Sequence, residues 1–316
     1  MGGSQRHAAG GYRRVTSGSA PWPGACDTHV HVFDPARFAY AARRRYTPGS
    51  ATVADLAAYL ATLGLSRVVI VAASVYGTDN RCLKAALLAL GQDRARGVAE
   101  IGEETSHSEI RALDQAGVRG ARLNLEVYRQ RDPALARGRL LSLARRIPRH
   151  WRVCLYGSLD LLAALRDDIA ALACPPVIEH FGMARVADGG TAAPGFASLV
   201  ALLRESGAFI KFSGPYQIAG DGPDYASAAP VARALAAAAE GRVLWGSNWP
   251  HTASAGRSAA PDLGRVEPFR DEDDRRNLGL LREWLGEDGA RHALVEAPVA
   301  AFGFTSPKDA ALPSAP

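Results

Sequence analysis

Two histidines one residue apart, His29 and His31, close the first apolar segment of the chain, residues 25–33 (ACDTHVHVF). Side chains two positions apart on a strand point to the same face, so the two imidazoles converge on one spot at the end of the strand. Titratable rings rarely occupy a buried strand unless they bind something or exchange a proton. The pair therefore indicates a site, with a hydrogen-bonded pair of core histidines as the alternative.

Further polar residues stand where the later apolar segments end. They are Ser74 and Tyr76, Glu103 and Glu104, Arg122, Tyr156, Glu179 and His180, Lys211, and Asn248 and His251. Four of the eight histidines (His29, His31, His180 and His251) fall at these ends. Chance would rarely place them so, and this clustering is stronger evidence for an active site than any single motif.

Apolar, β-rich segments alternate with segments of helical period along almost the whole chain. The predicted strands are residues 25–33, 67–74, 97–101, 120–125, 152–156, 176–180, 209–213 and 242–247. The predicted helices are residues 53–63, 82–90, 108–116, 133–146, 159–173, 196–205, 228–239, 271–285 and 289–302. Some eight β/α units with continuous apolar strands predict an α/β fold, a (β/α)8 TIM-type barrel. A doubly wound sheet is less favoured, because no Gly-x-Gly-x-x-Gly follows an early strand.

The rest of the chain narrows the class of protein. One domain, residues 25–304, is expected between a flexible N-terminal extension, 1–24, and a flexible tail, 305–316. Basic residues are scattered and almost all arginine, without aromatic interleaving, which argues against a nucleic-acid partner. No apolar run reaches the roughly 20 residues of a membrane span. Four widely spaced cysteines suit a reducing compartment, and we expect a cytoplasmic protein.

Five motifs carry a resemblance to a known family. They are Asp-x-His-x-His-Val-Phe at the first strand, Tyr-Gly-x-Asp-Asn after the second, Gly-x-Arg-x-Asn at the fourth, a single His at the sixth and Trp-Gly-Ser-x-Trp-Pro-His at the eighth. Over about residues 24–304 the chain resembles the amidohydrolase superfamily, of amidohydrolase-2 type. Within it, the chain is similar to the branch of 2-pyrone-4,6-dicarboxylate lactonase and the sugar-lactone enzymes. The resemblance implies a (β/α)8 fold and a lactonase-like hydrolase that acts on a carboxylic ester bond.

The resemblance also implies roles for residues. His29, His31 and His180 would surround the lactone carbonyl as hydrogen-bond donors and stabilise the oxyanion. Arg122 would hold a substrate carboxylate, with an ion pair to Glu103 or Glu104 as the alternative. The expected substrate-binding residues are Ser74, Tyr76, Arg122, Tyr156, Lys211, Gln217 and His251. For Tyr76, packing is an equal alternative, and for Lys211 an ion pair with an acidic residue.

Two positions depart from the lactonase pattern. Asn248 stands where the lactonases carry the aspartate that activates water, and an amide cannot take a proton in that role. The sugar-lactone isomerases carry the same asparagine, so Asn248 remains a catalytic candidate. Gln217 replaces an arginine, which argues against a second substrate carboxylate. The proton then falls to one of His29, His31, His180 or His251, with Lys211 or Arg122 polarising the substrate.

No metal or other cofactor is expected. His29, His31 and His180 could hold zinc with an open fourth position. However, Tyr156 and Asn248 stand where metal-dependent members supply a histidine and an aspartate. The leading prediction is a lactone hydrolase that acts on a small carboxylated or sugar-derived substrate. A lactone isomerase, a zinc-dependent hydrolase or decarboxylase, and a non-catalytic binding protein are the alternatives.

Overall fold

The fold was taken from a computed structural model, which describes residues 22–220, 224–252 and 262–306. Eight parallel strands form one sheet in the order β1 to β8, each hydrogen-bonded to the next along the chain. They are β1 (Cys26–Val30), β2 (Arg67–Val71), β3 (Ala95–Glu100), β4 (Val118–Asn124), β5 (Arg152–Tyr156), β6 (Val177–Ile178), β7 (Phe209–Ser213) and β8 (Val243–Gly246). The predicted (β/α)8 fold is confirmed.

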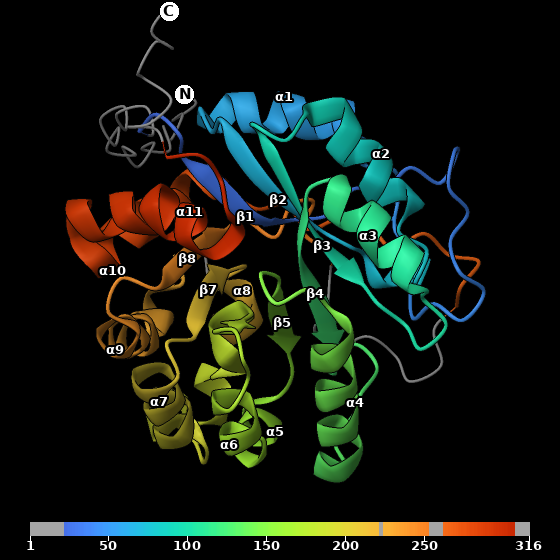
Figure 1. Ribbon diagram of the computed structural model, residues 1–316. Coiled ribbons are helices and arrows are strands. Elements are labelled where there is room, and N and C mark those ends of the chain that lie inside the picture. The colour runs from blue at the N-terminus through green and yellow to red at the C-terminus, as the bar shows by residue number, and fades with distance from the viewer. Residues whose placement is uncertain (1–21, 221–223, 253–261, 307–316) are drawn as a thin grey trace, which may run out of the picture.

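Helices surround the strands, as Figure 1 shows. They are α1 (Val53–Leu63), α2 (Arg81–Leu90), α3 (His107–Gln115), α4 (Pro133–Arg146), α5 (Leu159–Ala164), α6 (Arg166–Ala170), α7 (Phe196–Glu205), α8 (Tyr216–Ala219), α9 (Ala229–Ala239), α10 (Asp274–Leu294) and α11 (Glu296–Phe302). Local signals fix several of their starts. Thr52 and Ser106 form capping boxes with Asp55 and Glu109, and Asp132 caps α4, whose first residue is a proline.

The predicted helices differ most from the observed ones over residues 159–173 and 271–302. The helix expected over 159–173 is two short helices, α5 and α6, which meet at Leu165. The break expected after residue 285 is present as a kink at Gly286 within α10, but the second part of α10 ends at Leu294 and α11 begins at Glu296, where a single helix was expected over 289–302. Gly286 has a φ of 72°, which glycine adopts without steric cost, and this non-helical residue separates the two helical parts of α10.

The barrel closes where β8 meets β1. The backbone N–H of Asn248 donates to the carbonyl of His29 at 2.9 Å, and Val30 forms a parallel bridge with Trp249. Gly246 allows this approach, because a Cβ there would lie 2.6 Å from the Cβ of His29. Closure therefore brings the strand-8 motif directly against the paired histidines of β1.

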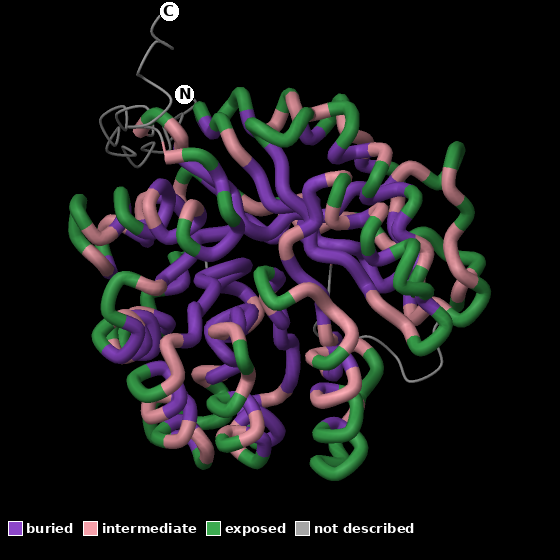
Figure 2. Tube along the Cα trace, in the orientation of Figure 1, coloured by how far each residue is buried: buried purple, intermediate pink, exposed green. Residues whose placement is uncertain are grey.

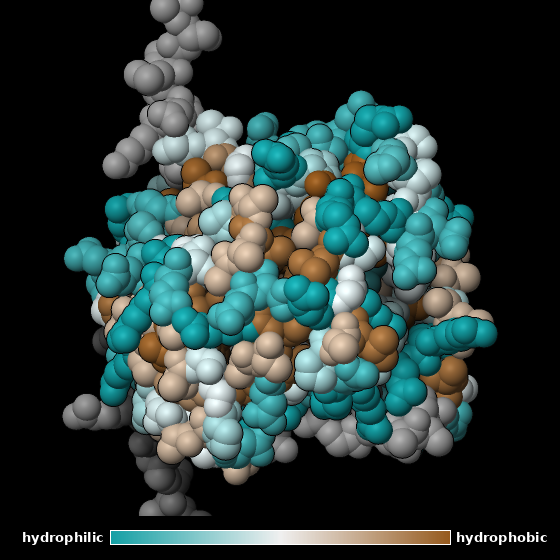
Figure 3. Space-filling model, turned by 60° about the horizontal axis from the view of Figure 1, so that its bottom comes forward, coloured by the Kyte–Doolittle hydropathy of each residue, from teal (hydrophilic) through white to brown (hydrophobic). Residues whose placement is uncertain are grey.

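Apolar residues fill the barrel interior away from the carboxyl ends of the strands. Val69, Val98, Cys154 and Leu244 pack there against Phe302 of α11. A second, larger apolar layer lies between the strands and the outer helices, and Figure 2 shows the buried strands inside a shell of exposed helix faces. On the face drawn in Figure 3, hydrophilic residues cover much of the surface and apolar ones lie in small groups among them. Buried polar side chains are therefore confined largely to the carboxyl ends of the strands.

The predicted extension 1–24 and tail 305–316 lie mostly outside the described residues. Trp22, near the end of the expected extension, packs against the core, and the Arg282 guanidinium lies 5.2 Å from the centre of its ring. Among the described residues, no helix is both long and apolar enough to cross a membrane.

Candidate active site

Three of the predicted histidines meet at the carboxyl end of the barrel. The ring centre of His29 lies 5.1 Å from that of His31 and 4.7 Å from that of His180. A register shift between Asp27 and Val30 accompanies this arrangement on β1. His180 follows β6. All three side chains are buried, so the barrel end holds a compact cluster of imidazoles, as the His-x-His spacing predicts.

Hydrogen bonds fix which nitrogen of each ring carries the proton. Nδ1 of His31 lies 2.8 Å from the carbonyl of Val71, and Nδ1 of His180 lies 3.1 Å from the carbonyl of Ser213. A carbonyl can only accept, so both Nδ1 atoms are donors. Nζ of Lys211 lies 3.3 Å from Nδ1 of His29. An ammonium can only donate, so this contact favours the neutral His29 tautomer with its proton on Nε2, while Oε1 of Glu179 lies 3.6 Å from the same Nδ1. His29 therefore differs from the other two histidines.

Burial keeps these rings neutral. It lowers the pKa of His31 to about 3, with the charge of Arg122 acting in the same direction. It lowers the pKa of His180 to about 4, although Glu179 partly opposes the change. The pKa of His29 is also well below its usual range, through burial and the charge of Lys211. At neutral pH, His31 and His180 consequently present lone pairs on Nε2.

A buried carboxylate links the cationic residues. Oε2 of Glu179 accepts from Nε of Arg122 at 3.0 Å, and Oε1 lies 3.6 Å from Nζ of Lys211. Burial alone would raise the pKa of Glu179, but Arg122 and Lys211 together outweigh it and bring the pKa to about 2. Arg122 thus pairs with Glu179, and the expected alternative of Glu103 or Glu104 was wrong. The ion pair expected as the alternative for Lys211 is present.

Aromatic side chains flank this cluster. The ring of Tyr156 lies 4.6 Å from that of His180, and the Arg122 guanidinium lies 5.3 Å from the same ring. Ser74 is buried in the turn after β2. The Tyr76 hydroxyl accepts from the backbone N–H of Asp34 at 2.9 Å, and its ring packs against Tyr40. That arrangement supports the packing role for Tyr76.

Asn248 is buried, and Nδ2 of its amide donates to the hydroxyl of Tyr216 at 2.7 Å. Tyr216 begins α8, which the sequence did not indicate, and Gln217 follows it on this helix, half-buried. The ring of Tyr216 also meets that of His251, with 6.2 Å between the ring centres. Asn248 and His251 are therefore connected through Tyr216.

His251 forms a dyad with a carboxylate. Its Nε2 lies 2.8 Å from Oδ2 of Asp274, which also accepts from the Tyr59 hydroxyl at 2.7 Å. Nδ2 of Asn277 donates to the other oxygen of Asp274 at 3.1 Å. A cavity of about 340 Å³ lies beside the dyad and is lined by both His251 and Asp274. His251 is thus held by α10, apart from the three clustered histidines.

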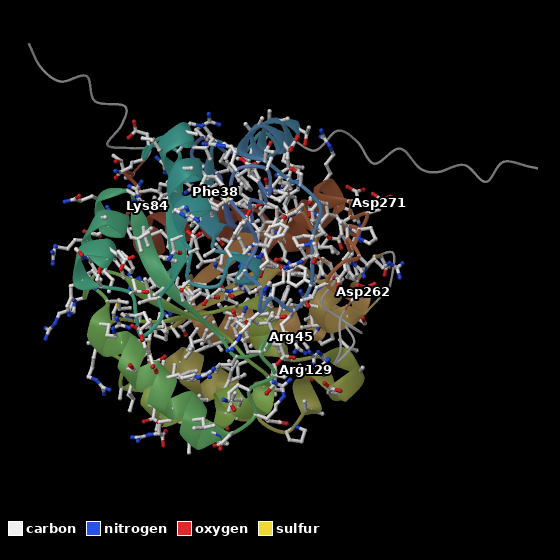
Figure 4. The ribbon with its side chains drawn as sticks, turned by 90° about the vertical axis from the view of Figure 1, so that its right-hand side faces the viewer. Phe38, Arg45, Lys84, Arg129, Asp262 and Asp271 are labelled. Atoms are coloured by element: carbon white, nitrogen blue, oxygen red, sulfur yellow. The ribbon has the colours of Figure 1, made fainter. Side chains whose placement is uncertain are left out.

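Loops cover the rim of the barrel end. Figure 4 labels Arg45 and Arg129, which belong to the loops that follow β1 and β4. Tyr128, beside Arg129, remains 42% exposed, and burial of the rest of its side chain raises its pKa to about 12. The charge of Glu100 also raises the pKa of this hydroxyl, and that of Arg122 lowers it.

Several site residues could not be identified from their own strand ends. Glu100 lies inside the third predicted strand, whereas the acidic residues predicted at the strand end, Glu103 and Glu104, lie beyond it and are exposed. Glu179 was visible beside His180 but carried no motif of its own. Asp27 also stands out: its Oδ1 accepts from the backbone N–H groups of His29 and Ser247, which ties β1 to β8. The alternation of strand side chains could have identified Glu100, since it shares a face with Val98.

Comparison with known proteins identifies the family of this chain. The family model described as "Amidohydrolase" matches residues 26–280. The chain belongs to this amidohydrolase family. It is 33% identical to a 4-sulfomuconolactone hydrolase of Rhizobium radiobacter over 89% of this chain and 90% of that protein. It is 30% identical to a D-galactarolactone isomerase of Agrobacterium fabrum, over 93% and 98%.

A solved structure shows the same fold. The protein, from Pseudomonas putida and assigned as a 2-pyrone-4,6-dicarboxylic acid hydrolase, aligns with a TM-score of 0.71 and 30% identity. The alignment covers 89% of this amidohydrolase and 98% of that chain. The similarity extends over the barrel as a whole, so the family resemblance expected from the motifs is confirmed.

One group in this amidohydrolase has the composition of a cation site. Ligand atoms of His29, Glu179 and His180 lie within 4.8 Å of one another. This set differs from the one expected, His29, His31 and His180. Lys211 and Arg122 already neutralise Glu179, and Nδ1 of His29 accepts from Lys211. The positive charges of Arg122 and Lys211 beside these ligands oppose the entry of a further cation, so the residues do not fit a divalent metal well.

Proposed function

We propose that this amidohydrolase hydrolyses the lactone ring of a small carboxylated or sugar-derived substrate. The observation that carries the proposal is the convergence of three neutral imidazoles with two buried cations, Arg122 and Lys211, at the carboxyl end of the barrel. Barrel enzymes build their active sites at this end. Relatives whose names denote lactone hydrolases, at 33% and 36% identity, support the same chemistry.

The three histidines have different hydrogen-bonding roles, because their tautomers differ. Nε2 of His29 carries a proton and is buried without a partner among the described residues. An oxyanion that forms there would satisfy this donor, which is the usual source of the largest catalytic effect. His31 and His180 present lone pairs and accept hydrogen bonds from substrate hydroxyls or from water. This assignment replaces the expectation that all three histidines donate.

Arg122 holds the substrate carboxylate in this scheme. Glu179 engages its Nε, and in the proposed scheme the two terminal nitrogens of the guanidinium bind the carboxylate. Their planar geometry matches a carboxylate. Tyr156, beneath the guanidinium, restricts its position and contributes a hydroxyl. The proposed reaction needs no divalent metal, because the fixed charges of Arg122 and Lys211 supply the positive field.

Asn248 favours a second candidate, lactone isomerisation. Its amide donates to Tyr216 and cannot take a proton from water. In an isomerase a hydroxyl of the substrate replaces water as the nucleophile, and Asn248 would orient it through Tyr216. The similarity to a D-galactarolactone isomerase supports this alternative.

Product mass separates the two candidates. The purified protein is incubated with a panel of carboxylated and neutral lactones, and the products are analysed by mass spectrometry and chromatography. Hydrolysis adds one water to the substrate mass, whereas isomerisation leaves the mass unchanged and shifts the retention time. A panel on which neither change occurs would contradict both functions and leave a binding protein.

A further inference from the structure

Glu100 is a buried carboxyl group that none of the roles above uses. It is the last residue of β3, on the same face as Val98, and it stands in register with Arg122 of β4. The residue is 9% exposed, and its Oε1 is buried without a hydrogen-bond partner among the described residues. The backbone of Glu100 is fixed on both sides by the Asn80 side chain, through its N–H at 3.1 Å and its carbonyl at 2.8 Å. A rigid strand end therefore holds an uncommitted carboxyl group in the barrel.

The cation nearest in register does not neutralise it. Nε of Arg122 is engaged by Glu179, and no ion pair joins Arg122 to Glu100 in the described part of the chain. Burial raises the pKa of Glu100 to about 7, with Arg122 opposing the rise and Glu179 adding to it. The charge of Glu100 also acts on Tyr128, whose pKa it raises. Near neutral pH this carboxyl group can both lose and regain a proton.

We propose that Glu100 is the proton acceptor of the lactone reaction, in place of the aspartate that Asn248 replaces. The inference rests on the proposed function. As the nucleophile oxygen bonds to the lactone carbonyl carbon, its proton passes to Glu100 and the carbonyl π pair moves to oxygen. The carbonyl then re-forms, the bond from the carbon to the ring oxygen breaks, and the ring oxygen takes the proton back from Glu100. The balance holds for water and for a substrate hydroxyl.

Other buried groups fit this role less well. His31 and His180 have pKa values of about 3 and 4, so a transferred proton would not be held by them at neutral pH. Glu179 is ionised between two cations. Asp27 also has a pKa raised by burial, to about 7, but the residue is fully buried and its Oδ1 is engaged by two backbone N–H groups. Glu100 combines burial with a free oxygen.

The test compares Glu100→Gln and Glu100→Asp with a matched control, Glu103→Gln. Glu103 is exposed and lies three residues further along the same segment. The probe is the lactone of the panel that the wild-type protein converts fastest. We expect Glu100→Gln to lower kcat by about 100-fold or more. The variant should also lose the limb of the pH profile of kcat/KM near pH 7. Glu100→Asp should keep a limb at a shifted pH, and Glu103→Gln should match the wild type.

A second readout does not depend on turnover. In protein labelled with ¹³C at the glutamate carboxyl groups, one resonance should titrate near pH 7 and be absent from Glu100→Gln. Active wild-type protein whose rate and pH profile survive in Glu100→Gln would overturn this proposal and leave the proposed function standing. Wild-type protein that converts no lactone would overturn both.

Discussion

Nζ of Lys211 lies 3.3 Å from Nδ1 of His29, at the centre of the barrel end. This contact favours the His29 tautomer with its proton on Nε2, because an ammonium has no lone pair to offer. The same ammonium lies 3.6 Å from Oε1 of Glu179, within the group that could otherwise hold a divalent cation. The Lys211 ammonium therefore has two effects: it favours a proton on Nε2 of His29, and its charge opposes the binding of a metal ion by His29, Glu179 and His180.

Replacing Lys211 by methionine should create a zinc site. The ligands His29, Glu179 and His180 would remain while the competing charge is lost. Thermal unfolding of Lys211→Met should shift upward on addition of zinc, since a ligand at 100 times its Kd stabilises by about 2.7 kcal/mol. The exposed Lys84→Met is the control and, like the wild type, should not respond. A wild-type shift equal to that of Lys211→Met would contradict the role given to Lys211.

His180→Ala should lower kcat by about 100-fold, because the lone pair that orients the nucleophile or substrate hydroxyl is lost. His107→Ala, an exposed site on α3, should leave the rate unchanged. Steady-state kinetics on the best lactone of the panel provide the measurement. Undiminished turnover by His180→Ala would count against the whole arrangement of the site.

Arg122→Lys should act mainly on KM for carboxylated lactones, raising it about tenfold or more, because a lysine keeps the charge for Glu179 but loses the planar fork. For neutral lactones, which have no carboxylate for the guanidinium to bind, KM should change by less than about threefold. Arg119→Lys, on the same strand but paired with Asp114, is the control. Equal effects on both substrate classes would show that Arg122 does not hold the carboxylate.

Glu100 should make the protein less stable at high pH. Its folded pKa of about 7 exceeds the unfolded value near 4.5, so between these values the folded state binds more protons and stability falls as pH rises. The loss is on the order of 3 kcal/mol once pH exceeds 7. Glu100→Gln should therefore unfold at a higher temperature than wild type at pH 8 but not at pH 4.5. Parallel curves for the two proteins across this range would exclude the raised pKa.

Asn248→Asp should increase hydrolysis, because it restores a carboxylate beside Tyr216. The double variant Glu100→Gln/Asn248→Asp should hydrolyse the lactone at least about tenfold faster than Glu100→Gln alone, because general-base catalysis is typically worth 100-fold or more. Mass spectrometry of the products measures the share formed with added water. If Asn248→Asp is inactive while folded, the amide itself is required and isomerisation becomes the better account.

Local patterns were sufficient for most of the fold. Residues 152–156 and 209–213 were predicted as strands at their observed bounds, since each is a short apolar run between turns. The helix over 53–63 was likewise predicted at its observed bounds. The His-x-His spacing also sufficed for His29 and His31, because the period of a strand places both on one face.

The pairings within the site could not be predicted in this way. Arg122 pairs with Glu179, 57 positions along the chain, rather than with the nearer Glu103 or Glu104. Such a contact depends on how the barrel curls and on which side chains point inward. The tautomers of the histidines, and the free carboxyl group of Glu100, depend on the same three-dimensional context. Sequence patterns identify which residue types stand at a strand end, whereas the residues that they contact in the folded barrel determine their protonation and their role.

The most direct test of the account is lactone turnover by protein whose metal content is measured before and after chelation. The account predicts that metal-free protein converts at least one carboxylated or sugar-derived lactone at an undiminished rate. Activity that disappears with the metal and returns with added zinc would contradict it. In that case His29, Glu179 and His180 would be metal ligands, and Lys211 would not supply the positive charge of the site.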